Sequence, residues 1–189
     1  MTLIRNVKWI LAAASVCALP ALAQQKLVAA QSEIVFVSKQ MGVPVEGRFN
    51  KFDAQISFDP AKPEAGKLAF TVDTGSATFG APESDAEMPK ATWFNVARFP
   101  QASFQSSAVK GLGAGKLEVR GKLAIKGNVH DVVVPVVLAQ SGPNTTATGA
   151  FVIKRLAFKI GENEWADTSM VADDVQVKFK LTLSGVAKL

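Results

Sequence analysis

Apolar residues recur at every second position through most of this 189-residue chain. This period is typical of β-strands with one buried face, and it excludes a mainly helical fold. Residues 175–183 are the clearest stretch, because Val, Val, Phe, Leu and Leu share one face while polar residues occupy the other. Turn signals such as Asp59-Pro60 and Gly127-Asn128 separate the strands. Shorter alternating stretches are Ile34 and Phe36; Ile56 and Phe58; Leu68, Phe70 and Val72; Leu117 and Val119; Leu123 and Ile125; and Phe151 and Ile153.

The strand pattern predicts one all-β domain over residues 24–189, an eight-stranded antiparallel β-barrel. About eight strands of about ten residues close a barrel. A barrel of this size is either filled by its own side chains or wide enough to hold one slim ligand. Several glycines within or beside the strands favour curvature and leave room inside. They are Gly42, Gly47, Gly66, Gly75, Gly80 and Gly121.

One predicted strand, residues 132–138, is apolar on both faces, so we expect another element to cover its outer face. Pro135 lies within it and is expected to interrupt its ladder. The best candidate for the cover is the segment 81–99, with a short helical region around 82–95. Trp93 and Phe94 either cap the mouth of the barrel or seat this helix on the valines of the strand.

The first 23 residues are predicted to be a secretory signal peptide. Arg5 and Lys8 precede an apolar run of about eleven residues, which ends in a small-residue cleavage site after Ala23. Such a run is shorter than the roughly 20 residues of a membrane span. We therefore expect export to the periplasm, and the single cysteine, Cys17, leaves with the leader.

The composition contains few residues of the types that serve as catalytic groups, and we predict that the protein is not an enzyme. One His, one Cys and no Tyr argue against a zinc site or a nucleophilic triad. The acidic pairs Asp85/Glu87 and Asp173/Asp174 are interpreted as solvated surface, and His130 as an exposed residue after a turn. Without a dense basic cluster, nucleic acid is not an expected partner, and neither a metal nor a cofactor is expected.

Three spaced blocks of residues between Ser32 and Trp165 carry a further signal, and the resemblance that they support extends over about residues 26–186. The first comprises Ser32-Glu33-Ile34-Val35-Phe36, Lys39, Gly42, Val45, Gly47, Phe49, Phe52, Ile56, Phe58 and Asp59. The second comprises Trp93-Phe94-Asn95-Val96-Ala97-Arg98-Phe99-Pro100, Phe104, Ser106, Val119, Gly121, Leu123, Ile125, Lys126 and Gly127. The third comprises Arg155, Phe158, Ile160, Gly161 and Trp165. In these blocks the chain resembles the YceI-like family of periplasmic polyisoprenoid-binding proteins, although Gln40 stands where the family pattern often has His.

The resemblance implies a lipocalin-like barrel with an apolar tunnel for a long isoprenoid chain, such as a polyprenyl lipid or a quinone tail. The implied partner is this lipid, the implied role is binding or carriage in the periplasm, and transient membrane contact accompanies it. The oligomeric state stays open. The predicted ligand-binding residues are Ile34, Phe36, Phe49, Phe58, Phe70, Trp93, Phe94, Phe151, Ile153, Arg155, Val177 and Phe179.

Two alternatives to a lipid carrier remain from the residues alone. The same Phe side chains fill an ordinary core equally well, in which case the protein is a structural or stress-response protein without a bound lipid. A small outer-membrane barrel is disfavoured, since it needs aromatic girdles and the chain has no Tyr. Arg155 is expected to point inward, where it needs a carboxylate such as Asp174 or a ligand head group.

Overall fold

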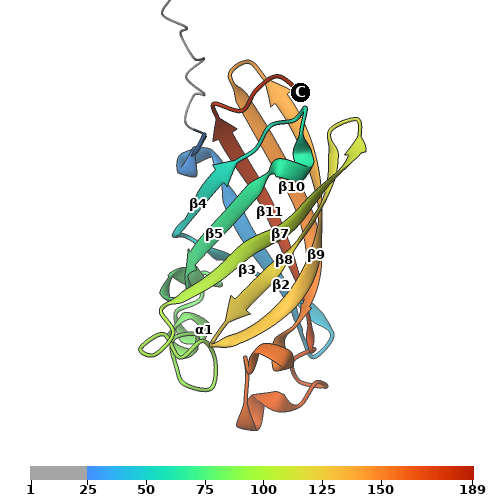
Figure 1. Cartoon of the computed structure of the whole chain (residues 1–189). Helices are drawn as coiled ribbons and strands as arrows, with labels where there is room; N and C mark the ends of the chain where they lie inside the picture. The colour runs from blue at the N-terminus through green and yellow to red at the C-terminus, as the bar shows by residue number, and fades with distance from the viewer. Residues whose placement is uncertain (1–24) are drawn as a thin grey trace, which may run out of the picture.

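In the computed structural model, which describes residues 25–189, the chain forms one antiparallel sheet that curls around a central axis (Figure 1). The predicted leader, residues 1–23, lies outside the described residues. The strands are β1 (Lys26–Leu27), β2 (Glu33–Gln40), β3 (Val43–Phe49), β4 (Phe52–Ser57), β5 (Lys67–Asp73), β6 (Ala77–Thr78), β7 (Gln101–Gly113), β8 (Lys116–Ile125), β9 (Asn128–Ser141), β10 (Asn144–Lys154) and β11 (Asp174–Ser184). The helices are α1 (Pro82–Glu87) and the short 3₁₀ turns η1 (Ala29–Gln31), η2 (Pro63–Ala65), η3 (Thr74–Ser76), η4 (Arg155–Phe158) and η5 (Asn163–Ala166).

The strand order is β4-β5-β7-β8-β9-β10-β11-β2-β3-β6, so β4 and β3 lie toward opposite ends of the sheet. These two strands follow one another in the chain, separated by Asn50 and Lys51, and together they behave as one sharply bent strand. Its first half pairs with β2 and its second half with β5. Counted this way, and without the two-residue β1 and β6, eight long strands remain, and the prediction of a lipocalin-like antiparallel barrel is confirmed.

The N-terminal segment helps to close the barrel beside β4. β1 pairs with the end of β11, and Gln25 makes two hydrogen bonds to the backbone of Phe58, just after β4. Its amide donates to the Phe58 carbonyl at 2.5 Å, and its side-chain oxygen accepts from the Phe58 N–H at 2.9 Å. The polar groups that a strand end leaves free are thereby satisfied.

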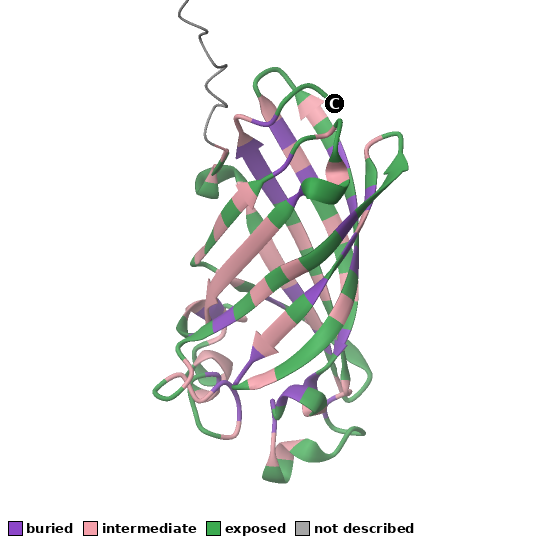
Figure 2. Ribbon diagram, in the orientation of Figure 1, coloured by how far each residue is buried: buried purple, intermediate pink, exposed green. Residues whose placement is uncertain are grey.

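Alternating burial follows the predicted phase of the strands (Figure 2). In β11 the residues from Val175 to Phe179 that face inward are half-buried, while Gln176 and Lys178 between them are exposed. Toward its end, Thr182 is also buried, because Val28 and Gln31 of the N-terminal segment lie over it and share hydrogen bonds with it. The alternation therefore predicts correctly which side chains of residues 175–179 face the lumen.

The prediction that another element covers the outer face of β9 is wrong. Val133 is 51% exposed and Val137 is 46% exposed, whereas Val134 and Val136 between them are buried inside the barrel. A valine-rich strand does not require two buried faces, because β-branched residues favour extended backbone even when exposed. The expected interruption at Pro135 is found on one side of the strand: the β9–β10 ladder stops at the Val136–Gly149 pair, whereas the β8–β9 ladder continues through Pro135.

The segment 81–99 lies instead at one end of the barrel, where the 155–172 segment also lies (Figure 1). Its α-helix is shorter than predicted, Pro82–Glu87, and turns follow it. Pro89, which lacks an N–H, ends the run of helical hydrogen bonds. Asp85 of this helix is not simply solvated, because its carboxylate accepts hydrogen bonds from the Thr78 hydroxyl and the Phe79 N–H, both at 2.6 Å.

These hydrogen bonds hold the pKa of Asp85 below its ordinary value. A depressed folded-state pKa stabilises the fold above the ordinary value, and this contribution disappears as the pH falls through the folded-state value. We expect Asp85→Asn to lower the melting temperature at neutral pH, with a difference from wild type that shrinks below about pH 4. Thermal melts of both proteins between pH 7 and pH 3 test this. A constant difference over that range contradicts it.

Candidate functional site

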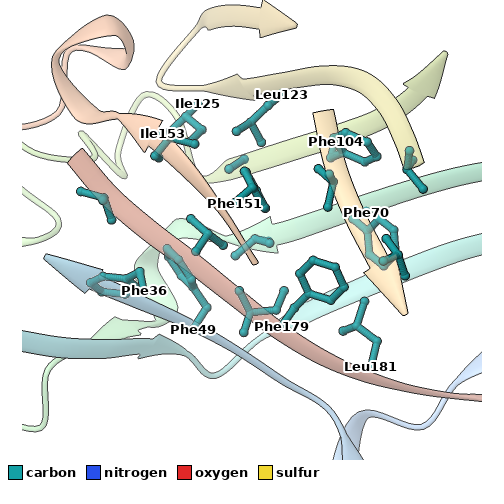
Figure 3. A pocket seen from close by; sticks show the side chains of 18 of the residues that line it. Phe36, Phe49, Phe70, Phe104, Leu123, Ile125, Phe151, Ile153, Phe179 and Leu181 are labelled. Carbon is teal, nitrogen blue, oxygen red and sulfur yellow. The ribbon is translucent and has the colours of Figure 1, made fainter. Parts of the chain in front are cut away.

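A cavity of about 230 Å³ runs inside the barrel and is bordered by side chains of nearly every strand. Figure 3 shows aromatic and aliphatic side chains converging on it from both walls. Among the 33 bordering residues, three have polar side chains: Ser38, Gln40 and Arg155. A lining of this kind excludes charged solutes and suits a hydrocarbon chain.

The cavity extends across two apolar clusters that meet inside the barrel. The cluster at the α1 end includes Phe36, Met88, Trp93 and Ile153, and the other includes Phe58, Val119, Leu138, Ala147 and Leu181. Phe151 packs against both clusters. The cavity is therefore elongated along the barrel instead of being confined to one end.

All twelve residues predicted to bind a ligand border this cavity. Trp93 and Phe94 cap it at the α1 end, where Phe94 packs edge-on against Phe49 with ring centroids 5.8 Å apart. They do not seat a helix on β9, whose Val134 and Val136 belong to the other apolar cluster. Contact of these twelve residues with a ligand stays a prediction.

The sequence reasoning missed much of the cavity wall. Most of the missed residues lie on strands and share the alternation already recognised, so the same signal identifies them. Phe79, Met88 and Ile160 lie outside the strands, where no period marks an inward residue. The missed strand residues include Phe104, Leu117, Val119, Leu123, Ile125, Val134, Val136, Leu138, Ala147, Leu181 and Leu183.

Close contacts between glycines and phenylalanine rings shape the wall. At Gly47 a Cβ atom would lie within 3.0 Å of the Phe36 ring, and Phe36 is its direct partner across β2 and β3. Gly149 lies under the Phe179 ring in the same way, and Gly121 under Phe104. Because each ring rests on bare backbone, it lies along the wall and leaves the centre of the barrel open.

We expect Gly47→Ala to lower the free energy of unfolding by about 1–3 kcal/mol, because the added methyl pushes the Phe36 ring from its place. Urea denaturation measures this change. The double variant Gly47→Ala/Phe36→Leu is the control, since a smaller side chain removes the overlap. The double variant should lose less than the sum of the two single changes. Strict additivity would show that the ring and the glycine do not constrain one another.

Arg155 is buried at the α1 end, with 1% of its surface exposed. The interpretation that it pairs with a carboxylate or a head group is wrong, because its five N–H groups donate to backbone carbonyls at 2.6–3.1 Å. Burial lowers the pKa of Arg155, and the nearby Asp173 acts in the opposite direction. The acceptors are the carbonyl oxygens of Ile160, Gly161, Trp165, Val171 and Ala172.

The remaining polar residues considered in the sequence have structural partners. Asp174 forms an exposed ion pair with Lys154 at 2.5 Å, and Asp173 accepts a hydrogen bond from the Leu156 N–H. His130 is exposed as predicted, and its Nε2 lies 3.0 Å from the Ala157 carbonyl oxygen. Within residues 25–189, no three His, Cys, Asp or Glu side chains gather as a metal site would require. No helix in this part of the chain is long and apolar enough to span a bilayer.

The antiparallel barrel and its elongated apolar cavity place the chain in the class of lipocalin-like β-barrels. The family model for the YceI-like domain matches residues 26–183, and the chain belongs to this family. BcnA of Burkholderia cenocepacia is 46% identical, with a TM-score of 0.80 over 82% of this chain and 98% of that structure. A polyisoprenoid-binding domain from Saccharophagus degradans shares the fold at 19% identity, with a TM-score of 0.70 over 85% of this chain and 98% of that structure.

Curated relatives match over part of their length. A UPF0312 protein of Vibrio cholerae is 34% identical over 106 residues, which is 56% of this chain and 56% of the relative. A UPF0312 protein of Shewanella baltica is 31% identical over 140 residues, or 69% of this chain and 73% of the relative. The matched part of the chain thus spans little more than half of the length of the Vibrio relative.

Proposed function

We propose that this protein binds and carries a long isoprenoid, or a similar amphiphilic lipid, in the periplasm. The observation that supports the proposal is the elongated cavity, in which 30 of the 33 bordering side chains are apolar. The family and the polyisoprenoid-binding neighbour point toward a binding protein and away from an enzyme. Periplasmic location rests on the leader predicted at residues 1–23.

The energetics of such a ligand favour exchange with a membrane. Burial is worth about 0.8 kcal/mol per methylene-sized group, or on the order of 30 kcal/mol against water for a chain of about forty carbons. This exceeds the ceiling of about 18–21 kcal/mol for non-covalent binding, so ordering the chain opposes much of it. Transfer from a bilayer exchanges one apolar medium for another, which lets the protein load and unload during transient membrane contact.

Extraction of the purified protein with organic solvent, followed by mass spectrometry, tests the proposal. We expect a long isoprenoid in the extract, and the delipidated protein should take up an added polyprenyl lipid. The protein must be purified from a periplasmic fraction without detergent, so that a detergent molecule does not occupy the cavity. An empty extract together with no uptake would contradict the carrier role and favour a structural or stress-response protein.

A further inference from the structure

The wall of the barrel has a seam between β9 and β10, which diverge toward the α1 end (Figure 1). Their ladder ends at the Val136–Gly149 pair. Beyond it, in the part of the chain that the structure describes, residues 128–135 of β9 and 150–154 of β10 do not pair with one another. On their other sides the same residues stay paired, β9 with β8 and β10 with β11. Two unpaired strand edges therefore face each other within the sheet.

Pro135 determines where the seam begins. Lys126 and Gly127 have φ values of 50° and 76°, as in a type I′ hairpin, whose flanking residues exchange hydrogen bonds. Because these bonds alternate along an antiparallel ladder, the even-numbered residues of β9 bond to β8 and the odd-numbered residues face β10. Pro135 is odd-numbered and has no N–H, so it cannot donate to Ala150, the next partner in the register.

Side-chain contacts close the other end of the seam. The Nε2 atom of His130 lies 3.0 Å from the Ala157 carbonyl oxygen, and its ring packs edge-on against Phe158 with centroids 4.8 Å apart. The Asn128 amide donates to the Phe158 carbonyl at 3.3 Å. Both carbonyls belong to η4, which directly follows β10. The seam thus runs from a backbone ladder at one end to a few side-chain contacts at the other.

The cavity lies directly behind the seam, and the outer rim of the seam is apolar. Val134 on β9 and Phe151 and Ile153 on β10 face inward and border the cavity. On the outside, Val133 is 51% exposed and Val152 is 55% exposed. These two valines are counterparts in the register that the paired part of the strands sets. A hydrocarbon chain that crosses the seam therefore meets apolar side chains on both faces of the wall.

The seam is also where the wall parts at the lowest cost. Separating two paired strands breaks backbone hydrogen bonds that contribute to stability, whereas residues 128–135 and 150–154 share none in the described chain. Other strand ends that extend past a neighbour are covered, since β1 pairs with the end of β11 and η2 packs against β7.

From these observations, and on the basis of the proposed lipid carriage, we propose that the seam is a lateral portal. An isoprenoid chain passes between a bilayer and the cavity sideways, between β9 and β10. Val133 and Val152 lie against the bilayer during this passage, and the contacts of His130 with η4 release as the seam opens.

A cleavable cross-link across the seam tests this inference. Val133→Cys/Val152→Cys places thiols on its two rims, and the single cysteine of the chain, Cys17, lies in the predicted leader. The shortest thiol-cleavable bis-maleimide that joins the pair holds the seam at its resting width. The delipidated protein is mixed with phosphatidylcholine vesicles that carry a radiolabelled polyprenyl alcohol, and uptake is followed after the vesicles are pelleted. We expect the link to slow uptake about tenfold or more, to leave the equilibrium affinity unchanged, and to lose its effect when dithiothreitol cleaves it.

Val137→Cys/Thr148→Cys, joined by the same reagent, is the matched control. These two residues are exposed partners on the same strands, but they lie where the ladder is intact. Uptake by this linked protein should equal that of wild type. Wild-type rates for both linked pairs, the same slowing in both, or slow uptake that cleavage does not restore overturns the portal while lipid carriage stands. No uptake by the wild-type protein overturns both the portal and the proposed function.

Discussion

Ala147→Phe is expected to weaken the binding of a long isoprenoid by roughly 50-fold or more. Ala147 is buried on β10, borders the cavity, and lies between Leu138 and Leu181 of the neighbouring strands. A phenyl ring at this position projects into the space that the lipid would occupy. Excluding even three methylene-sized groups of the ligand, at about 0.8 kcal/mol each, costs about 2.4 kcal/mol, or roughly 50-fold in Kd.

Thr148→Phe is the matched control for this prediction. Thr148 is the next residue of β10 and faces outward, where it is exposed. The same ring is therefore added outside the barrel, and lipid binding should stay as in wild type. Binding of a radiolabelled polyprenyl alcohol to the two variants gives the comparison, with melting temperatures as the check of folding. Equal affinity of a folded Ala147→Phe variant and wild type would place the lipid elsewhere than in the cavity.

Periodicity could predict the wall of this site because the lumen face of a strand is set by the pleat alone. Phe151 and Ile153 on β10, and Val177 and Phe179 on β11, point inward as their alternation requires. The same rule could not predict whether the interior is hollow. That property depends on close pairs such as Gly149 with Phe179, which join residues far apart in the chain.

Two other features could not be predicted from the sequence, and each has a physical reason: the uncovered outer face of β9 and the hydrogen-bond partners of Arg155. The valines of β9 satisfy a strand's conformational preference without any cover, so their outward-facing members say nothing about packing. Arg155 points inward as expected, but its partners are backbone carbonyls. Every residue type has a backbone carbonyl, so such an acceptor cannot be recognised from the sequence, whereas a carboxylate partner requires Asp or Glu. The segment 160–172 that supplies these carbonyls has no regular period.

Arg155→Met is expected to lower the free energy of unfolding by about 3–5 kcal/mol. The change removes all five donors, and each abandoned carbonyl is a buried acceptor whose loss of a partner costs about 1–3 kcal/mol before water or local rearrangement relieves part of the cost. The acceptors span residues 160–172, so this segment should open first and expose the α1 end of the cavity. Hydrogen exchange should report faster amide exchange there than in β7 and β8.

Lys154→Met is the control, because this neighbouring cation forms an ion pair in which both side chains are about 60% exposed. Exposed pairs contribute little, so its loss should leave the stability close to that of wild type. Arg155→Lys keeps the charge but supplies three N–H donors in place of five, and should fall between Arg155→Met and wild type. Chemical denaturation of the three variants distinguishes hydrogen bonding from charge. If Arg155→Lys were as stable as wild type, the positive charge alone would account for the stability that we attribute to the five-carbonyl network.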